Sequence, residues 1–271
     1  MNQDTASVTL VVADMAGTLA DFGSCAPARA FVRLFDTHGI QVTDAQAREP
    51  MGMQKRDHIE AMLRMPAIAE QWATVKGSAW TESNLNALYA EFIPLQIEIL
   101  PEFSGLVPGA AQTLDALRSR GVKVAATTGY NREMMEVVLS AMRDQGLTFD
   151  AAVCAEDVAS GRPAPWMIFR AMELTGAYPP AKVVKIGDTI PDIEAGLRAG
   201  VCSVGVTDTG NMVGLNETEW GGLSESEQTA RRAVAEQAMK NAGAHYVLSG
   251  IDALPPLIDQ LNDRLAKGER P

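Results

Sequence analysis

An aspartate at the end of an apolar run is the first candidate for chemistry. Residues 9–13 form a β-branched run typical of a buried parallel strand, and Asp14 follows directly. A carboxylate at the carboxyl end of such a strand lies where open α/β sheets bind ligands, so Asp14 is a candidate nucleophile. Gly17 then turns the chain sharply. Ala16, two residues after Asp14, has no side-chain acid or base for a leaving group.

A hydroxyl, a glycine and an arginine follow two further predicted strands. Thr128 and Gly129 precede Tyr130 and a helix that Asn131 could cap. Free backbone N–H groups and the helix dipole at such a start favour an anion such as a phosphoryl group. Arg162 comes after the next strand and could hold phosphoryl oxygens in its planar guanidinium fork. These residues predict a phosphoryl-binding site.

Two carboxylates, Asp188 and Asp192, stand four residues apart at a predicted strand-to-helix turn. Hard oxygen ligands around one charged group suit Mg²⁺, which keeps several waters and is seldom enclosed by protein alone. Each signal also has an ordinary interpretation: Asp14 could cap a helix, Arg162 could be a solvated charge, and the two carboxylates could balance a helix dipole. Their position after four strands, in chain order, favours a single shared site.

The elements that must position these residues alternate regularly. Short apolar segments rich in β-branched residues predict strands, and helical patterns separate them. The predicted strands are residues 9–13, 122–126, 151–154, 183–186, 203–206 and 246–248, and the helices between them are 110–119, 132–145, 165–175 and 191–199. This alternation predicts an α/β fold with a doubly wound parallel sheet covered on both faces.

One segment interrupts the alternation with helix after helix. Helical patterns occur at 27–37, 45–48, 57–65, 68–76 and 82–100. An all-helical insertion after the first strand would lie above the carboxyl edge of the sheet, where a lid belongs. We therefore expect a helical cap domain at residues 21–102 and an α/β core domain formed by residues 1–20 and 103–271.

Local signals predict some of the boundaries. Thr43 and Gln46 have the spacing of a capping box, as do Ser224 and Glu227, so each pair predicts a helix start. Residues 207–222 are rich in glycine, threonine and asparagine and are expected to form a loop.

The whole chain is acidic. Its 271 residues carry a formal net charge of −11, and 46% are hydrophobic and 21% charged, which is ordinary for a soluble globular protein. The charge argues against nucleic acid as a general partner. No apolar stretch approaches the ~18 residues of a membrane span, and we recognise no export signal. Three cysteines without CxxC spacing suggest reduced thiols in a cytoplasm.

The order of these signals resembles the haloacid dehalogenase superfamily over essentially the whole chain, with residues 21–102 as its cap domain. The resemblance implies an aspartyl nucleophile at Asp14 and usually Mg²⁺, without fixing the substrate. Superfamily members that hydrolyse phosphate esters usually carry a second aspartate at the position of Ala16, which protonates the departing alcohol. Another group must therefore handle the leaving group here.

Several segments are similar to those that distinguish the phosphonoacetaldehyde hydrolase (phosphonatase) family within this superfamily. They are residues 22–23, 26–27, 50–58, 128–135, 161–167 and 243–246. In that family a lysine of the 50–58 segment forms a Schiff base with the aldehyde, and the resemblance places this role on Lys55. It also implies a homodimer joined through the caps. In the mechanism that we expect, His58, about one turn after Lys55, relays protons.

The chemistry of carbon–phosphorus cleavage supports this assignment. Heterolysis would leave a carbanion, which is too basic to depart unassisted, whereas condensing the neighbouring aldehyde with an amine provides an iminium electron sink. No departing oxygen then needs a proton. The same mechanism therefore explains both the absence of an acid at Ala16 and the presence of Lys55. The amine must be neutral to attack, so desolvation or a nearby cation such as Arg56 should lower its pKa from ~10.4.

Under this hypothesis Asp14 attacks phosphorus to form an aspartyl phosphate, and water later releases phosphate and acetaldehyde. Mg²⁺ would be held by Asp14, the backbone carbonyl of Ala16 and Asp188, with Asp192 beside them. The predicted substrate contacts are Ala16, Met51, Thr128, Gly129, Tyr130 and Arg162.

Alternatives remain open at this point. A phosphomonoesterase or phosphomutase of the same superfamily would act on a generic phosphate ester without Lys55. A non-catalytic phosphate-binding protein would bind phosphate without turnover, since Ala16 deletes a familiar carboxylate. Met15 and Leu19 depart from the phosphonatase pattern, and Ser24 stands where cysteine is sometimes found. Hydrolysis of a related phosphonate aldehyde or ketone is therefore a further alternative.

Overall fold

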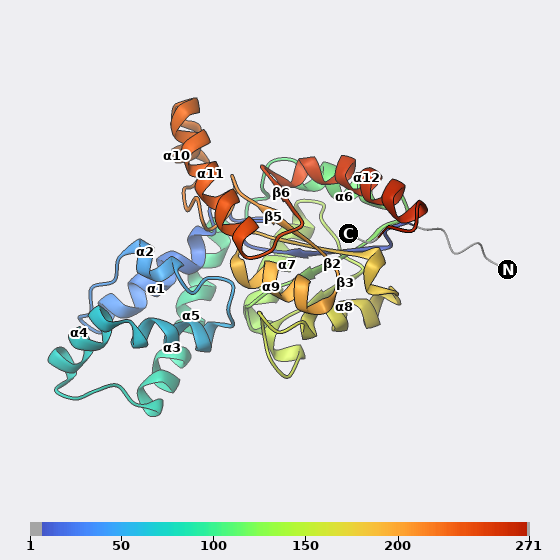
Figure 1. The fold of residues 1–271 in the computed structure, drawn as a ribbon. Helices are drawn as coiled ribbons and strands as arrows, with labels where there is room; N and C mark the ends of the chain where they lie inside the picture. Colours follow the sequence, from blue (N-terminus) through green and yellow to red (C-terminus); the bar gives the residue numbers. More distant parts are fainter. Residues whose placement is uncertain (1–6, 270–271) are drawn as a thin grey trace.

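One parallel β-sheet forms the centre of the computed structural model, which describes residues 7–269 (Figure 1). Its strands are β1 (Leu10–Asp14), β2 (Lys123–Thr127), β3 (Ala151–Val153), β4 (Val183–Gly187), β5 (Cys202–Val206) and β6 (Tyr246–Leu248). They lie in the order β3-β2-β1-β4-β5-β6, and every neighbouring pair is parallel. This is a doubly wound order, so the predicted fold class is confirmed.

The central strand β1 shows why an unbroken apolar run is needed. Leu10 and Val12 pack into one hydrophobic layer, whereas Val11 and Ala13 pack into the other. Side chains of a strand alternate between the two faces of a sheet, so a strand covered on both sides must be apolar at every position. Asp14 ends the run at the carboxyl edge.

Helices cover both faces of this sheet (Figure 1). The helices are α6 (Ala110–Ser119), α7 (Arg132–Asp144), α8 (Trp166–Thr175), α9 (Ile190–Ala199), α11 (Glu225–Asn241) and α12 (Leu254–Ala266), with short 3₁₀ turns at Ala155–Asp157, Pro180–Lys182 and Ile251–Ala253. Helices α6 and α12 lie on one face, and α8 and α9 lie on the other. Because these helices cover the faces of the sheet, the carboxyl ends of its strands remain uncovered by them and form the open edge of the core.

Five helices follow β1 and form a group of their own beside the sheet (Figure 1). They are α1 (Cys25–Thr37), α2 (Asp44–Arg48), α3 (Lys55–Arg64), α4 (Pro66–Lys76) and α5 (Glu82–Phe103). Phe31 of α1 and Phe92 of α5 stack with ring centroids 4.5 Å apart, and both are fully buried. This group corresponds to the expected helical insertion, and the domain boundaries at residues 20 and 103 remain a prediction.

Two linkers join the helical group to the core, and they run side by side. Ala20 and Leu106 form an antiparallel bridge. The N–H of Asp21 donates to the carbonyl of Gly105 at 3.0 Å. The chain therefore leaves the core and rejoins it at the same place.

Both predicted capping boxes are confirmed, at the start of α2 and of α11. The expected loop at 207–222 is wrong in part, because α10 (Glu217–Gly221) lies within it. Asn216 and Glu219 form a capping box there, a spacing that could have been recognised in the sequence. Helix α12 also has no predicted counterpart.

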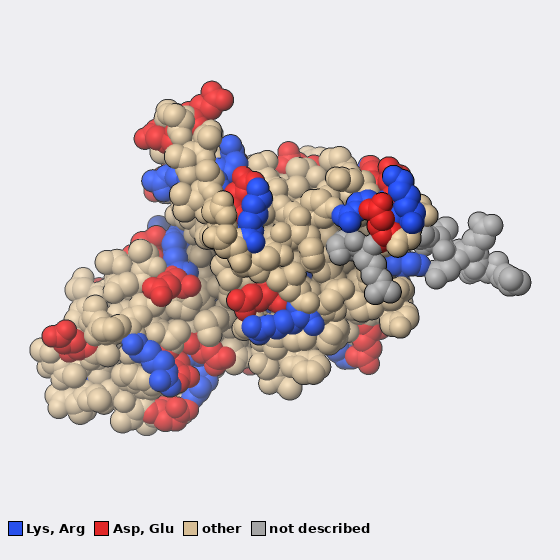
Figure 2. Space-filling view, viewed as in Figure 1, with Lys and Arg blue, Asp and Glu red and all other residues tan. Residues whose placement is uncertain are grey.

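Charged side chains on the face shown in Figure 2 are scattered, and basic groups often stand beside acidic ones. Some pair at helical spacing, such as Arg64 with Glu60 and Arg198 with Glu194. Within residues 7–269, every helix is too short or too polar to cross a membrane.

Candidate active site

A small cavity lies where the strand ends of the core meet the cap helices. Its volume is about 20 Å³, which is room for about one water molecule. Nine of the residues predicted to form the site line this cavity: Asp14, Ala16, Met51, Lys55, Thr128, Gly129, Tyr130, Arg162 and Asp188. Two others, His58 and Asp192, lie behind its walls. The fold thus gathers side chains from both the core and the helical insertion.

Arg162 connects two of the carboxylates. Its buried guanidinium forms ion pairs with Asp14, at 2.9 Å, and with Asp192. Burial alone would lower the pKa of Arg162, but the two carboxylates raise it. Its Nε has no hydrogen-bond partner in the part of the chain that the structure describes. A guanidinium with donor capacity to spare suits phosphoryl oxygens.

Three buried carboxylates could hold a metal ion. Asp14, Asp188 and Asp192 each present an oxygen, and these atoms all lie within 4.8 Å of one another. Burial, followed by the charges of Asp14 and Asp192, raises the pKa of Asp188 well above its usual value. A divalent cation with oxygen ligands would relieve this crowding, so the residues fit such an ion. Gly17 has a φ of 75°, and a Cβ there would overlap the Asp188 carboxylate.

A lysine that sequence reasoning did not single out lies beneath these groups. Lys185 of β4 is 1% exposed, and its Nζ is 2.8 Å from Asp192 Oδ1. Burial would raise the pKa of Asp192, but the charges of Arg162 and Lys185 lower it to about 2. Thr189 also donates its hydroxyl to Asp192 at 2.5 Å. Asp192 therefore stays ionised. Lys185 could have been recognised in the sequence, because a lysine within an apolar strand is unusual.

Lys55 is the first residue of α3 and is 6% exposed. Its Nζ lies 5.0 Å from the ring centroid of Tyr130 and 5.5 Å from that of Phe31. Burial, followed by the charge of Arg162, lowers the pKa of Lys55 to about 8. The predicted depression of the pKa is thus confirmed. A neutral amine at this site becomes accessible near physiological pH.

The prediction that Arg56 helps to lower the pKa of Lys55 is wrong. Arg56, its neighbour in sequence, points to the surface and pairs with Glu82 and Asn86 of α5. Successive helical residues point about 100° apart, so a neighbour in sequence need not be a neighbour in space. Arg162, from the distant core segment, supplies the positive charge instead.

His58 lies one turn after Lys55 and is fully buried. Its ring stacks on Phe31 at 3.8 Å, and Nε2–H donates to the carbonyl of Ala47 at 2.9 Å. Burial, followed by the charge of Lys55, lowers the pKa of His58 well below its usual value. His58 is therefore neutral and lies outside the cavity, and its role as a proton relay remains a prediction.

The loop after β2 meets the cap closely. A Cβ on Gly129 would lie 2.6 Å from the carbonyl oxygen of Met53, so only glycine allows this approach. The Tyr130 hydroxyl is buried without a hydrogen-bond partner among the described residues, and burial raises its pKa well above the usual value. Asn131 caps α7 as predicted, because its Oδ1 accepts from the N–H of Met134 at 2.9 Å.

Comparison with known proteins decides the family. A family model described as haloacid dehalogenase-like hydrolase matches residues 8–200. The chain is 39% identical to the phosphonoacetaldehyde hydrolase of Paraburkholderia phytofirmans over 264 residues, which cover 97% of this chain and 99% of the relative. It is 41% identical to that of Hahella chejuensis, covering 97% and 90%. The chain belongs to the phosphonoacetaldehyde hydrolase family. It is therefore a hydrolase of the haloacid dehalogenase-like group.

Solved structures place this phosphonoacetaldehyde hydrolase family member among similar folds. A phosphonoacetaldehyde hydrolase-like protein from Oleispira antarctica superposes with a TM-score of 0.97 at 43% identity, covering 98% of this chain and 97% of that chain. A β-phosphoglucomutase from Clostridium difficile has a TM-score of 0.69 at 15% identity, covering 96% and 99%. The second likeness shows a shared fold alone.

The residues that depart from the phosphonatase pattern have different surroundings in this hydrolase. Met15 and Leu19 are fully buried and pack in the main hydrophobic core. Ser24, in contrast, lines the candidate cavity. The lining of the cavity therefore differs from the phosphonatase pattern at Ser24. Met15 and Leu19 can change the shape of the cavity only through their packing in the core.

Asp21 is a second polar residue that sequence reasoning missed. It has a φ of 55°, and its carboxylate accepts from the N–H groups of Cys25, at 2.9 Å, and Ala26, at 3.0 Å, where α1 begins. Burial raises the pKa of Asp21 to about 7. In the sequence it is a single aspartate in a linker, and only the fold places it at the entrance to the cap of this family member.

Proposed function

We propose that this hydrolase cleaves the carbon–phosphorus bond of phosphonoacetaldehyde and releases acetaldehyde and inorganic phosphate. The observation that supports this most directly is the buried Lys55, whose pKa is lowered to about 8 and which opens onto the same cavity as Asp14. Relatives named phosphonoacetaldehyde hydrolase share 39% and 41% identity over nearly the whole chain.

The cap half of the cavity would prepare the leaving group. The neutral amine of Lys55 adds to the aldehyde carbon, and loss of water leaves an iminium. The positively charged nitrogen then accepts the electron pair of the breaking carbon–phosphorus bond, which gives an enamine. Protonation at carbon and hydrolysis of the imine release acetaldehyde and return the amine. Burial of Lys55 favours the neutral form that begins this sequence.

The core half would receive the phosphoryl group. Asp14 attacks phosphorus in line and forms an aspartyl phosphate, which water then hydrolyses. Some N–H groups of Arg162 that now bond to Asp14 would donate to the phosphoryl oxygens instead. Thr128 and Gly129 would also hold these oxygens. Ala16 offers no acid, and none is needed because the departing atom is carbon.

Mg²⁺ is part of this proposal. Asp14, Asp188 and the backbone carbonyl of Ala16 would hold the ion, and Asp192 would stand beside it. When bound, the ion offsets the negative charge of the phosphoryl group and of the carboxylates around it. The crowding of three buried carboxylates supports this assignment.

Imine trapping tests the proposal. The enzyme is incubated with phosphonoacetaldehyde, reduced with borohydride and analysed by peptide mass spectrometry. We expect a two-carbon adduct on Lys55 and release of inorganic phosphate, both absent in Lys55→Arg. Lys76→Arg, a substitution at the end of α4 in the cap, is the matched control.

Two outcomes would contradict the proposal. Full activity of Lys55→Arg on phosphonoacetaldehyde would remove the Schiff base. Faster hydrolysis of 4-nitrophenyl phosphate than of phosphonoacetaldehyde, unchanged in Lys55→Arg, would favour a phosphomonoesterase or phosphomutase. A wider panel of phosphonate aldehydes and ketones tests the related-substrate alternative.

A homodimer and a cytoplasmic location, both predicted from the sequence, belong to the same proposal. All three cysteines are free thiols, which supports a reducing compartment. Light scattering should give twice the chain mass of 29.0 kDa. A monomer at micromolar concentration would contradict the dimer and leave the chemistry untouched.

A further inference from the structure

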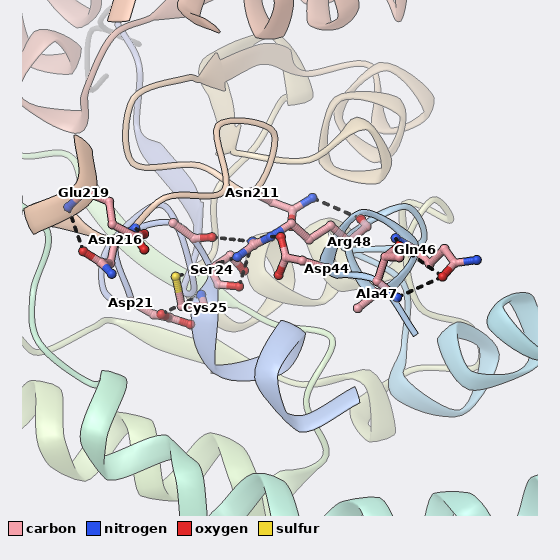
Figure 3. Close-up of polar contacts among 12 residues, drawn as sticks. Asp21, Ser24, Cys25, Asp44, Gln46, Ala47, Arg48, Asn211, Asn216 and Glu219 are labelled. Carbon is pink, nitrogen blue, oxygen red and sulfur yellow. Dashed lines mark hydrogen bonds and ion pairs between the residues drawn. The ribbon is translucent and has the colours of Figure 1, made fainter. Parts of the chain in front are cut away.

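Arg48, the last residue of α2, is a mostly covered cation outside the catalytic cavity. Its side chain is 12% exposed, and its Nε donates to Asp44 at 2.6 Å. Its Nη1 donates to the backbone carbonyl of Gly23 at 2.6 Å. It also donates to the backbone carbonyl of Ser24, at 3.3 Å (Figure 3). One cap side chain therefore holds the linker through which the chain enters the cap.

Asn211, in the loop after β5, reaches the same group from the core (Figure 3). Its Oδ1 accepts from Arg48 Nη1 at 3.2 Å, and its Nδ2 donates to the Arg48 carbonyl at 3.2 Å. The backbone N–H of Asn211 donates to Asp188 Oδ2 at 2.8 Å. A single core residue thus contacts both the cap and a carboxylate assigned to the metal.

The residue two before Asn211 extends these contacts. The hydroxyl of Thr209 donates to the carbonyl of Gly17, in the turn after the nucleophile, at 2.6 Å. The carbonyl of Thr209 accepts from the N–H of Gly23 in the linker at 2.8 Å. The loop therefore contacts the nucleophile turn, the linker and the cap at once.

The Arg48 carbonyl also stands at the base of the segment that carries the amine. It accepts from the N–H of Met51 at 3.0 Å as well as from Asn211 Nδ2. Met51 lines the catalytic cavity together with Lys55. The position of Arg48 therefore sets where the segment leading to Lys55 begins.

We propose that Arg48 and Asn211 are positioning residues that align the amine-bearing cap segment with the Asp188 carboxylate. Apolar contacts alone would let the cap slide over the core, whereas a guanidinium and an amide that bond in both directions admit one alignment. The chemical consequence of this alignment rests on the proposed function. The alignment itself does not require a substrate.

Cys25 reports on this contact without any substrate. Its Sγ lies 3.8 Å from Arg48 Nη2 and is partly exposed, whereas Cys154 and Cys202 are buried. Its rate of alkylation by iodoacetamide therefore measures opening of the cap. We expect Asn211→Ala to raise this rate about tenfold, the effect of losing about one hydrogen bond to a charged group. Mg²⁺ with inorganic phosphate should slow alkylation more in the wild type than in the variant.

A matched control separates alignment from general loosening of the loop. Asn216→Ala removes an asparagine of the same loop that caps α10 and lines a pocket with Cys25 and Arg48, but whose side chain bonds to the N–H of Glu219 and not to Arg48. It should leave Cys25 alkylation within about twofold of the wild type, as expected for a substitution outside the contact. Circular dichroism and the unfolding temperature check that each variant folds.

Catalytic measurements give the second readout. Asn211→Ala and Arg48→Ala should each slow borohydride trapping of Lys55 and lower kcat/KM about tenfold. Because both variants lose the bond between Arg48 Nη1 and Asn211 Oδ1, the loss in the double variant should be smaller than the product of the two single losses. If Asn211→Ala does not fold, Arg48→Lys, which keeps the charge but loses the fork, takes its place.

The outcomes are separable. Unchanged Cys25 alkylation in folded Asn211→Ala, or effects that simply add in the double variant, would overturn the positioning role. The wild type could instead fail to hydrolyse phosphonoacetaldehyde while Cys25 is still alkylated faster in Asn211→Ala than in the wild type. This result would overturn the proposed substrate and leave the positioning role intact.

Discussion

The core half and the cap half of the candidate active site differ in how their buried charged groups are paired. In the core half, Asp192 is held between Arg162 and Lys185, and Arg162 also pairs with Asp14. In the cap half, Lys55 lies against two aromatic rings and forms no ion pair with any carboxylate of residues 7–269. Pairing keeps a buried group ionised, whereas isolation favours its neutral form.

The difference matches the proposed work of each half. Binding and transferring a phosphoryl group requires charges that persist, and the core provides them on the ends of rigid strands. Making an imine requires an amine that gives up its proton, and the cap provides it by burying a lysine against aromatic rings, with no ion pair to a carboxylate among the described residues. Each prediction below tests one side of this contrast.

Replacing the isolated lysine should have the largest effect. Lys55→Met should lower kcat about 10⁴-fold or more, since the covalent nucleophile toward the aldehyde is lost. The same substitution should raise the free energy of unfolding at pH 7 by about 3 kcal/mol, because the folded protein no longer buries an ammonium whose pKa falls from 10.5 to about 8. Urea denaturation measures this gain.

The pH dependence gives the sign of this stability effect. Between pH 8 and 10.5 the folded wild type has released the Lys55 proton while the unfolded chain retains it, so wild-type stability rises with pH. The advantage of Lys55→Met should therefore shrink across this window and vanish above it. A wild type more stable than Lys55→Met at pH 7 would contradict the contrast.

Removing the paired lysine of the core should have the next largest effect. Lys185→Met leaves Arg162 as the main cation facing Asp192, so Arg162 is held away from the phosphoryl oxygens. We expect kcat/KM to fall about 100-fold, as for loss of a preorganised charge, and inhibition by inorganic phosphate to weaken. Lys123→Met, at the far end of β2 where Nζ donates to the Thr175 carbonyl, is the control. Equal effects of both variants would argue for mere destabilisation.

The rate of imine formation should follow the neutral fraction of Lys55. Since its pKa is about 8, the initial rate of borohydride trapping should rise about tenfold from pH 7 to pH 9, with its midpoint near pH 8. Stopped-time mass spectrometry at saturating aldehyde measures it. A midpoint at the ordinary lysine value would show that the cap leaves the amine solvated.

The smallest effect is expected at a core residue beside Asp14, the proposed nucleophile. Met15 is fully buried away from the cavity, so Met15→Leu should cost less than about 1.5 kcal/mol of stability and leave KM within about twofold. Thermal denaturation and steady-state kinetics check both. A large change in KM would show that the core layer under the strand ends shapes the pocket.

The sequence was sufficient for the sheet, since the apolar runs at β1, β2, β4 and β5 each lie within one residue of the predicted start and end. It was also sufficient to name most residues of the cavity. It could not show that Arg162 rather than Arg56 faces Lys55, because that depends on how distant segments fold together. Lys185 was missed although a lysine within an apolar strand is visible in the sequence, because the strand pattern alone does not show that its amine faces Asp192 of the following helix.

Helix α12 was missed for a different reason. Leu254, Leu257, Ile258 and Leu261 have helical spacing and are all buried. Two prolines stand at its first turn, where they are tolerated because those N–H groups need no partner within the helix. A segment of this kind is visible in the sequence, but only when proline is treated as a start signal.

The paired linkers have a consequence for how such enzymes diversify. Because Ala20 and Leu106 are bridged, the cap begins and ends at neighbouring points of the core. A different insertion with equally close ends could be accommodated there without altering the order of the strands. Natural selection could in this way exchange the part that recognises the organic moiety of a substrate while inheriting the phosphoryl-transfer apparatus intact.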